Sequence, residues 1–154
     1  MLKELNENIR ETHCTLIAHG VNAQGVMGSG VAKVLSDKCP EVKTSYINYC
    51  KLYSRPNMLL GKVQIAHLND GKTKVANCFT QQNYGKDGQV YLNYEALQEC
   101  IESLYDYAIE NGHKEIAISR IGCGLAGGDW EIVKSMLTFN IRQNLIVNVY
   151  YLAW

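Results

Sequence analysis

The stretch His19-Gly-Val-Asn-Ala-Gln-Gly-Val-Met-Gly-Ser-Gly-Val-Ala32 decides the fold of this chain. It follows a short apolar run, Leu16-Ile17-Ala18, that is typical of a buried strand, and an amphipathic pattern typical of a helix follows it. Glycine lacks a Cβ atom, so the backbone of such a turn can adopt positive φ and approach a ligand closely. A strand, a glycine-rich turn and a helix in this order place backbone N–H groups around a phosphate.

A second glycine-rich segment, Ile121-Gly-Cys-Gly-Leu-Ala-Gly-Gly-Asp-Trp130, has the same setting between a predicted strand and a predicted helix. Both segments leave the carboxyl ends of predicted strands. Because ligands of α/β sheets bind at that edge, we expect the two segments to lie close together there. Two glycine loops that face one ligand suggest a clamp for a diphosphate.

The composition predicts one folded domain spanning residues 1–154, with 47% apolar residues and only two prolines. The fifteen basic residues are balanced by fifteen acidic ones. This balance argues against a protein that binds nucleic acid or a membrane surface by bulk charge, whereas a small anion held by backbone amides needs no basic excess. No run approaches the ~18 apolar residues of a membrane-spanning helix. We therefore expect a cytoplasmic protein.

The six cysteines form no C-x-x-C pair, and most of them lie inside apolar patterns. We interpret them as reduced thiols of an intracellular protein. His13, His67 and His113 show no metal-ligand spacing with the cysteines. The sequence therefore predicts no metal site and no cofactor.

Strand and helix patterns alternate along the chain, which predicts an α/β fold with helices on both faces of a mixed, mostly parallel sheet. Asp70-Gly71 predicts a hairpin between two of the strands. Residues 1–10 fit either a first strand or a frayed arm. The predicted strands are residues 15–19, 62–68, 74–79, 115–119 and 145–152, and the predicted helices are residues 29–39, 40–53, 92–110 and 129–142.

The first loop does not match two common phosphate-binding motifs. It lacks the terminal Gly-Lys-Ser/Thr of a P-loop. Its order Gly25-x-x-Gly28-x-Gly30 departs from G-x-G-x-x-G, and no acidic residue about 20 positions on ends a second strand. A dinucleotide-dependent dehydrogenase is therefore disfavoured.

Taken together, the two glycine loops and Pro40-Glu41 closely resemble a macrodomain over about residues 8–151. The nearest branch is the small ADP-ribose-1''-phosphate phosphatases, with ADP-ribosyl-glutamate glycohydrolases as relatives. The resemblance implies a three-layer α/β/α domain that binds ADP-ribose, or its 1''-phosphate, at the edge of the sheet. We expect a monomer with no membrane partner and no direct contact to nucleic acid.

The resemblance also implies which residues hold the ligand. The first loop would hold the terminal ribose and the proximal phosphate, and the second would wrap the diphosphate. Asn8 stands where macrodomains usually carry an aspartate on the adenine amino group, and Tyr150 or Tyr151 is placed to pack on the adenine. The implied ligand-binding residues are Asn8, Ile9, Asn22, Gly25, Met27, Gly28, Ser29, Gly30, Ile121, Gly122, Cys123, Gly124, Leu125, Ala126, Gly127 and Tyr150.

His19 is the predicted catalytic residue, because the phosphatase branch carries a histidine directly before the first loop. We expect it at the end of its strand, where it could act as a nucleophile or as a general acid–base in removing the terminal phosphate. Asp129 could assist it. Asp129 is also a natural N-cap for the helix that follows, and the two roles could coexist.

Two other functions remain open. The glycohydrolase relatives use a lysine after the fourth strand and an aspartate inside the second loop. Gln81 or Gln82 and Ala126 occupy the corresponding places here, and these side chains can neither form a lysyl adduct nor ionise. That difference counts against the removal of ADP-ribose from a macromolecule. The third possibility is a non-catalytic module that binds ADP-ribose.

Overall fold

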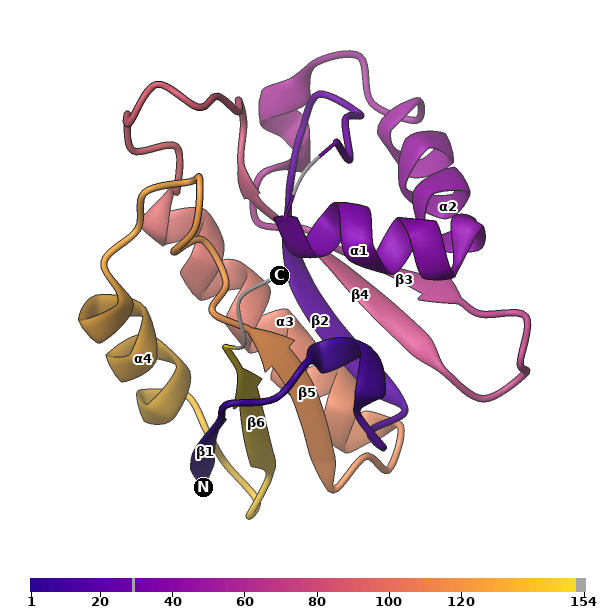
Figure 1. Ribbon diagram of the computed structural model, residues 1–154, viewed down its shortest axis with the longest axis vertical. Coiled ribbons are helices and arrows are strands. Elements are labelled where there is room, and N and C mark those ends of the chain that lie inside the picture. The colour runs from indigo at the N-terminus through magenta and orange to yellow at the C-terminus, as the bar shows by residue number, and fades with distance from the viewer. Residues whose placement is uncertain (29, 152–154) are drawn as a thin grey trace.

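A six-stranded sheet runs through the centre of the protein in the computed structural model, which describes residues 1–28 and 30–151 (Figure 1). The strand order is β1-β6-β5-β2-β4-β3, and only β3 runs antiparallel to its neighbour. The mixed, mostly parallel sheet is therefore confirmed, and so is the strand alternative for the first residues. The strands are β1 (Leu2–Leu5), β2 (Leu16–Asn22), β3 (Val63–His67), β4 (Lys74–Gln81), β5 (Glu115–Ser119) and β6 (Ile146–Tyr150).

Helices cover both faces of this sheet, which confirms the predicted three-layer α/β/α architecture (Figure 1). Pro40 opens the second helix at its first position, where its missing N–H costs no hydrogen bond. Among the described residues, no helix is both long and apolar enough to cross a membrane. The α-helices are α1 (Gly30–Lys38), α2 (Pro40–Cys50), α3 (Tyr94–Glu110) and α4 (Trp130–Phe139), and the short 3-10 helices are η1 (Ile9–Glu11) and η2 (Pro56–Leu59).

The side chains of β2 alternate between two hydrophobic cores. Leu16 and Ala18 pack in the core that α3 and α4 cover, whereas Ile17 and Val21 pack in the core that α1 and α2 cover. A strand buried on both faces has a continuous apolar sequence, because neither face meets water. This is why the run before the first glycine loop indicates a central strand.

The hairpin between β3 and β4 forms as predicted. Asp70 Oδ1 accepts hydrogen bonds from the backbone N–H of Lys72 at 2.9 Å and of Thr73 at 2.8 Å. Gly71 adopts a φ of 78°, a region that favours glycine. The Asp-Gly pair thus closes the turn by both its side chain and its backbone.

β2 is longer than predicted, and this places His19 inside the sheet. The strand continues to Asn22, because Gly20 is one of its residues rather than the start of the turn. A Cβ atom on Gly20 would lie 2.9 Å from Thr80 Oγ1, so the packing between the strands requires a glycine here. The expectation that His19 ends its strand at the edge of the sheet is wrong, since its side chain is fully buried.

A chain of polar side chains links buried His19 to α2. His19 Nε2 lies 2.5 Å from Asn77 Oδ1 on β4, and Asn77 Nδ2 donates to Gln64 Oε1 on β3 at 2.7 Å. Gln64 Nε2 in turn donates to Ser45 Oγ. Because an amide oxygen only accepts, Nε2 carries the imidazole proton. Burial lowers the pKa of His19 to about 4, so the ring is neutral at neutral pH.

We predict that this buried histidine makes the fold sensitive to acid. Between pH 6.5 and about 4 the unfolded chain binds a proton that the folded chain excludes, so the free energy of unfolding falls as the pH falls. The full effect is about 3 kcal/mol. His19→Gln removes the titrating group and keeps an amide donor for Asn77. Urea unfolding from pH 7 to pH 4 should show a steeper loss for the wild type than for this variant; parallel curves would contradict the prediction.

Candidate functional site

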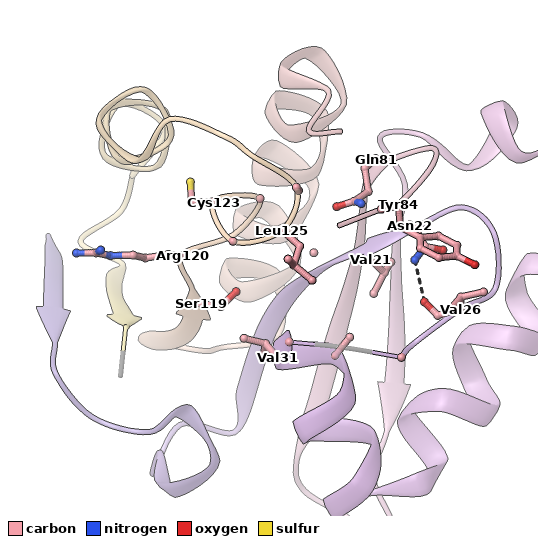
Figure 2. Close-up of a pocket in the computed structure, with 18 of the residues that line it drawn as sticks. Val21, Asn22, Val26, Val31, Gln81, Tyr84, Ser119, Arg120, Cys123 and Leu125 are labelled. Atoms are coloured by element: carbon pink, nitrogen blue, oxygen red, sulfur yellow. Dashed lines mark hydrogen bonds between the residues drawn. The ribbon is translucent and has the colours of Figure 1, made fainter. Parts of the chain in front are cut away.

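A cavity of about 520 Å³ opens at the edge of the sheet where β2, β4 and β5 end (Figure 2). Its volume lies within the ~300–1,000 Å³ range of small-molecule sites. Both glycine loops contribute to its wall, as the shared carboxyl edge of parallel strands predicts. The lining consists of residues 20–22, 26, 28, 30–32, 81, 84–86, 119, 120, 122–126, 150 and 151.

The second glycine loop is folded back on itself by its own backbone. Gly128 N donates to Gly122 O at 2.8 Å, and Gly127 N donates to Gly124 O at 3.0 Å. Gly127 has a φ of 75°, and a Cβ atom added to it would lie 2.9 Å from the carbonyl oxygen of Gln89. The close approach of residues 89–90 therefore excludes a side chain at Gly127.

This folding leaves several N–H groups of the loop without an acceptor in the described part of the chain. They belong to residues that line the cavity: Gly122, Gly124, Leu125 and Ala126. Consecutive backbone N–H groups in a tight loop form a concave site for an anion, because each carries a partial positive charge. Four such groups in five residues are suited to a ligand with several phosphate oxygens.

The first glycine loop is shaped by the side chain of Asn22. Its Nδ2 donates to Val26 O at 2.8 Å, the hydrogen bond drawn in Figure 2, and its Oδ1 accepts from Gln24 N at 2.9 Å. The hydroxyl of Tyr46 lies 2.9 Å from the same oxygen. Asn22 therefore forms the turn, and one N–H of its amide is left over for a ligand. The predicted contact of Asn22 with a ribose stays a prediction.

The helix α1 begins at the cavity. Its first residues, Gly30, Val31 and Ala32, all contribute to the lining. The first N–H groups of a helix have no partner within the helix, and the aligned peptide dipoles place partial positive charge there. The helix end and the second glycine loop thus provide neutral donors from two elements.

A planar cationic surface lies on one side of the cavity. The guanidinium carbon of Arg120 is 4.5 Å from the ring centroid of Tyr151 and 5.0 Å from that of Trp130. Glu4 Oε1 accepts from Trp130 Nε1 at 3.0 Å and lies 3.3 Å from Arg120 Nη2. Hydrogen bonds from Lys134, first of all, and then from Trp130 hold the pKa of Glu4 below its usual value. Glu4 therefore stays ionised and helps to hold Arg120 in place.

Polar side chains lie on the other side of the cavity. Asn22, Gln81 and Tyr84 are grouped there, away from Arg120 (Figure 2). Lys86, two residues after Tyr84, also lines the cavity and brings a second positive charge. The two ends of the cavity thus differ: the Arg120 guanidinium lies beside two aromatic rings at one end, and an exposed polar loop lies at the other.

The structure brings part of the predicted ligand-binding set to the cavity. The predicted residues that line it are Asn22, Gly28, Gly30, Gly122, Cys123, Gly124, Leu125, Ala126 and Tyr150. The predicted residues outside the lining are Asn8, Ile9, Gly25, Met27, Ile121 and Gly127. Ser29 lies outside the described residues.

The residues that do not line the cavity have structural contacts instead. Ile9, Met27 and Ile121 are at least 96% buried in the hydrophobic cores. Asn8 caps η1, its Oδ1 accepting from Arg10 N at 3.0 Å. Near the glycine loops, therefore, apolar residues support the cavity from behind rather than lining it.

Neither predicted catalytic side chain belongs to the lining of the cavity. His19 is buried in β2, as described above. Asp129 Oδ1 accepts from Glu131 N at 2.9 Å, so Asp129 is the N-cap of α4. The capping role is therefore confirmed, whereas the catalytic roles of His19 and Asp129 stay predictions that the shape of the cavity does not support.

The structure adds lining residues that the sequence analysis does not assign to the ligand site, among them Lys86, which the sequence suggests is a solvated loop residue. Tyr84, Gly85 and Lys86 belong to a polar loop after β4, and Arg120 directly follows β5. Such a loop is usually solvated, so its composition gave no signal. Their positions after the carboxyl ends of central strands could have identified them, since ligands bind at that edge.

Comparison with known proteins assigns the chain to a family. The sequence model of the Macro domain matches residues 18–137. The chain belongs to the Macro domain family.

The chain is 30% identical to the ADP-ribose 1''-phosphate phosphatase of Lodderomyces elongisporus, over 88% of this chain and 85% of that protein. It is 26% identical to the DNA ADP-ribosyl glycohydrolase of Mycobacterium tuberculosis, over 82% of this chain and 35% of that protein. Among solved structures, the macrodomain of Mycobacterium tuberculosis DarG is similar with a TM-score of 0.83 and 22% identity, covering 100% of this chain and 99% of that one. This last likeness concerns the fold alone.

We predict that the second glycine loop tolerates no side chain at Gly127. Gly127→Ala should destabilise the protein more than Gly71→Ala, although both glycines have similar positive φ. Both variants lose about 1–2 kcal/mol to the left-handed backbone. At Gly127 the Cβ atom also meets backbone, which adds at least about 1 kcal/mol, whereas at Gly71 it meets open space. Urea unfolding of the two variants checks this, and equal losses would contradict it.

Proposed function

We propose that this protein binds ADP-ribose 1''-phosphate in the cavity and hydrolyses its terminal phosphate ester. The observation that carries the proposal is the set of backbone N–H groups at Gly122, Gly124, Leu125 and Ala126 that have no acceptor among the described residues. The substrate is suggested by the relative from Lodderomyces elongisporus, which is named an ADP-ribose 1''-phosphate phosphatase.

The diphosphate of the ligand lies against the second glycine loop and the start of α1. Backbone N–H groups are fixed donors, so they need no reorganisation to receive the phosphate oxygens. Arg120 and Lys86, both in the lining, supply the positive charge that balances the phosphates. Binding and hydrolysis therefore proceed without a metal ion.

The adenine packs on Tyr151 beside Arg120. The Arg120 guanidinium carbon lies over the Tyr151 ring and Tyr151 is 38% exposed, so a flat base can pack on the ring. Tyr150 is 2% exposed, and its hydroxyl lies 2.8 Å from Thr12 Oγ1. Of the two tyrosines at the end of the last strand, Tyr151 is therefore the one that contacts the base.

With the adenine at Arg120, the terminal phosphate reaches the opposite side of the cavity, near Gln81 and Tyr84 (Figure 2). Water attacks the terminal phosphorus, and the bond between phosphorus and the oxygen on C1'' breaks. The products are ADP-ribose and inorganic phosphate. Lys86 neutralises charge on the phosphoryl group as it transfers, which is the main contribution a protein makes in such reactions.

We predict that the purified protein releases phosphate from ADP-ribose 1''-phosphate and that Lys86→Ala lowers kcat/KM by about 100-fold, the usual cost of removing one electrostatic stabiliser. Lys72→Ala removes another exposed lysine, from the β3–β4 hairpin, and should leave kcat/KM unchanged. Activity should persist in EDTA. A colorimetric assay of released phosphate measures all three.

His19→Gln belongs in the same assay. Since His19 is buried and absent from the lining, the folded variant should keep most of its activity. Loss of activity in folded His19→Gln would reinstate the predicted catalytic histidine. Tight ADP-ribose binding by the wild type without release of phosphate would overturn the proposal and favour a binding module.

Removal of ADP-ribose from a macromolecule is a second candidate, favoured by one observation. Lys86 lines the cavity on the loop that follows β4, although the position that the glycohydrolase relatives fill with lysine holds Gln81 or Gln82. The neutral amine of Lys86 would attack C1'' of a bound ADP-ribosyl group and displace the macromolecule as the bond between C1'' and that macromolecule breaks; water would then hydrolyse the lysyl adduct to ADP-ribose and the free amine. Release of ADP-ribose from modified DNA or modified glutamate would support this candidate over the phosphatase.

We also propose that the protein acts as a monomer in the cytoplasm. All six cysteines are free thiols, as expected for a reducing compartment. One chain supplies the glycine loops, the helix end and both cationic side chains of the cavity, so ligand binding needs no second copy. Light scattering of the purified protein tests the monomeric state.

A further inference from the structure

A second group of chemically versatile side chains lies at the opposite edge of the sheet from the cavity. His13 and Cys14 precede β2, and Glu115 is the first residue of β5. Ser119, at the far end of β5, lines the cavity. Four steps along an extended strand correspond to about 13 Å, so the two places are separate.

The donor atoms of this group are close together. His13 Nε2 lies 2.8 Å from Glu115 Oε1, and Cys14 Sγ lies 3.6 Å from the same oxygen. One donor atom of each side chain lies within 4.8 Å of the other two, and within residues 1–28 and 30–151 no other three such residues are grouped in this way. In a tetrahedral zinc site with bonds of 2.0–2.3 Å, neighbouring ligand atoms are about 3.3–3.6 Å apart. The Cys14–Glu115 distance already has this value, and the His13–Glu115 pair must open by only about 0.5 Å.

We propose that His13, Cys14 and Glu115 form a binding site for Zn²⁺. Imidazole nitrogen, thiolate sulfur and carboxylate oxygen are the three kinds of ligand that zinc takes from proteins. The thiolate and the carboxylate together carry two negative charges, which balance the charge of the ion. The His13 side chain is 74% exposed, so the site opens to solvent and water supplies the fourth ligand.

Neighbouring groups hold two of the three ligands in place. Asn148 Nδ2, on β6, donates to Glu115 Oε1 at 3.0 Å and to Ile116 O at 3.2 Å. Cys14 N donates to Thr12 Oγ1 at 3.1 Å. Outer partners of this kind fix the orientation of metal ligands before the ion arrives. The site is therefore partly organised in the folded chain.

Binding requires that Cys14 lose its proton. Burial, and then the charge of Glu115, raise the pKa of the Cys14 thiol, so the metal-free protein holds a neutral thiol. Zn²⁺ displaces that proton to solvent as the thiolate–zinc bond forms, and no electron is transferred. An ion held in this way joins the start of β2 to the start of β5, and because it binds only the folded chain it stabilises that chain.

Titration of the full-length protein with Zn²⁺, and with Co²⁺ as a coloured probe, tests the proposal. We expect one ion per chain and a near-ultraviolet charge-transfer band from a thiolate–cobalt bond. Cys14→Ser, His13→Ala and Glu115→Gln should each weaken Zn²⁺ binding by more than about 100-fold, since loss of an outer partner alone costs about 10–100-fold. Zn²⁺ should also raise the melting temperature of the wild type but not of Cys14→Ser.

Two control variants remove a histidine and a cysteine outside the proposed zinc site. His67→Ala removes an exposed histidine at the end of β3, and Cys39→Ser removes a half-buried cysteine outside the group; both should bind Zn²⁺ like the wild type. Circular dichroism confirms that each variant is folded, and Glu115→Gln keeps the side-chain volume. Wild-type affinity in Cys14→Ser or Glu115→Gln, or an equal loss in Cys39→Ser, would overturn the proposal. The readout is binding alone, so it is decided independently of the phosphatase activity.

Discussion

The cavity depends on the way the second glycine loop uses its own hydrogen bonds. The loop folds back through bonds from Gly127 and Gly128, and this geometry leaves the N–H groups of residues 122 and 124–126 without acceptors among the described residues. An unpaired N–H is costly when it is buried and useful when it lines an open cavity, where water or a ligand pairs with it. The fold-back bonds thus create the anion site, and the close approach of residues 89–90 requires the glycine at position 127.

β2 brings the rest of the site to this loop. It runs parallel to both β4 and β5, so the carboxyl ends of all three strands meet at the edge where the cavity opens. Hydrophobic side chains alternate along β2 into two cores, and the buried His19–Asn77 hydrogen bond links this strand to β4. His19 therefore lies within the strands beneath the cavity and does not line it. The predicted acid sensitivity of the fold and the shape of the site both depend on β2.

Much of the fold could be predicted from the sequence, because burial on both faces leaves long apolar runs and because Pro40, Asp70 and Asp129 mark their elements chemically. The end of β2 could not be predicted, because Gly20 resembles the start of a turn. Position 20 requires a glycine because Thr80, on another strand, lies too close for a side chain. The glycine loops were located correctly, whereas the charged ends of the cavity were not. The sequence alone does not distinguish polar residues such as Lys86 and Arg120 in a binding site from the same residues in a solvated loop. The group at His13 joins residues about one hundred positions apart, which no local pattern records.

The most direct test of the central claim follows the backbone amides while ADP-ribose is added. In two-dimensional NMR of the labelled protein, the amide signals of Gly122, Gly124, Leu125 and Ala126 should move most, together with those at the start of α1, and the amide of Gly71 in the distant hairpin should not move. Binding that leaves these four amides unchanged, or that moves signals mainly at the opposite edge of the sheet, would contradict the account.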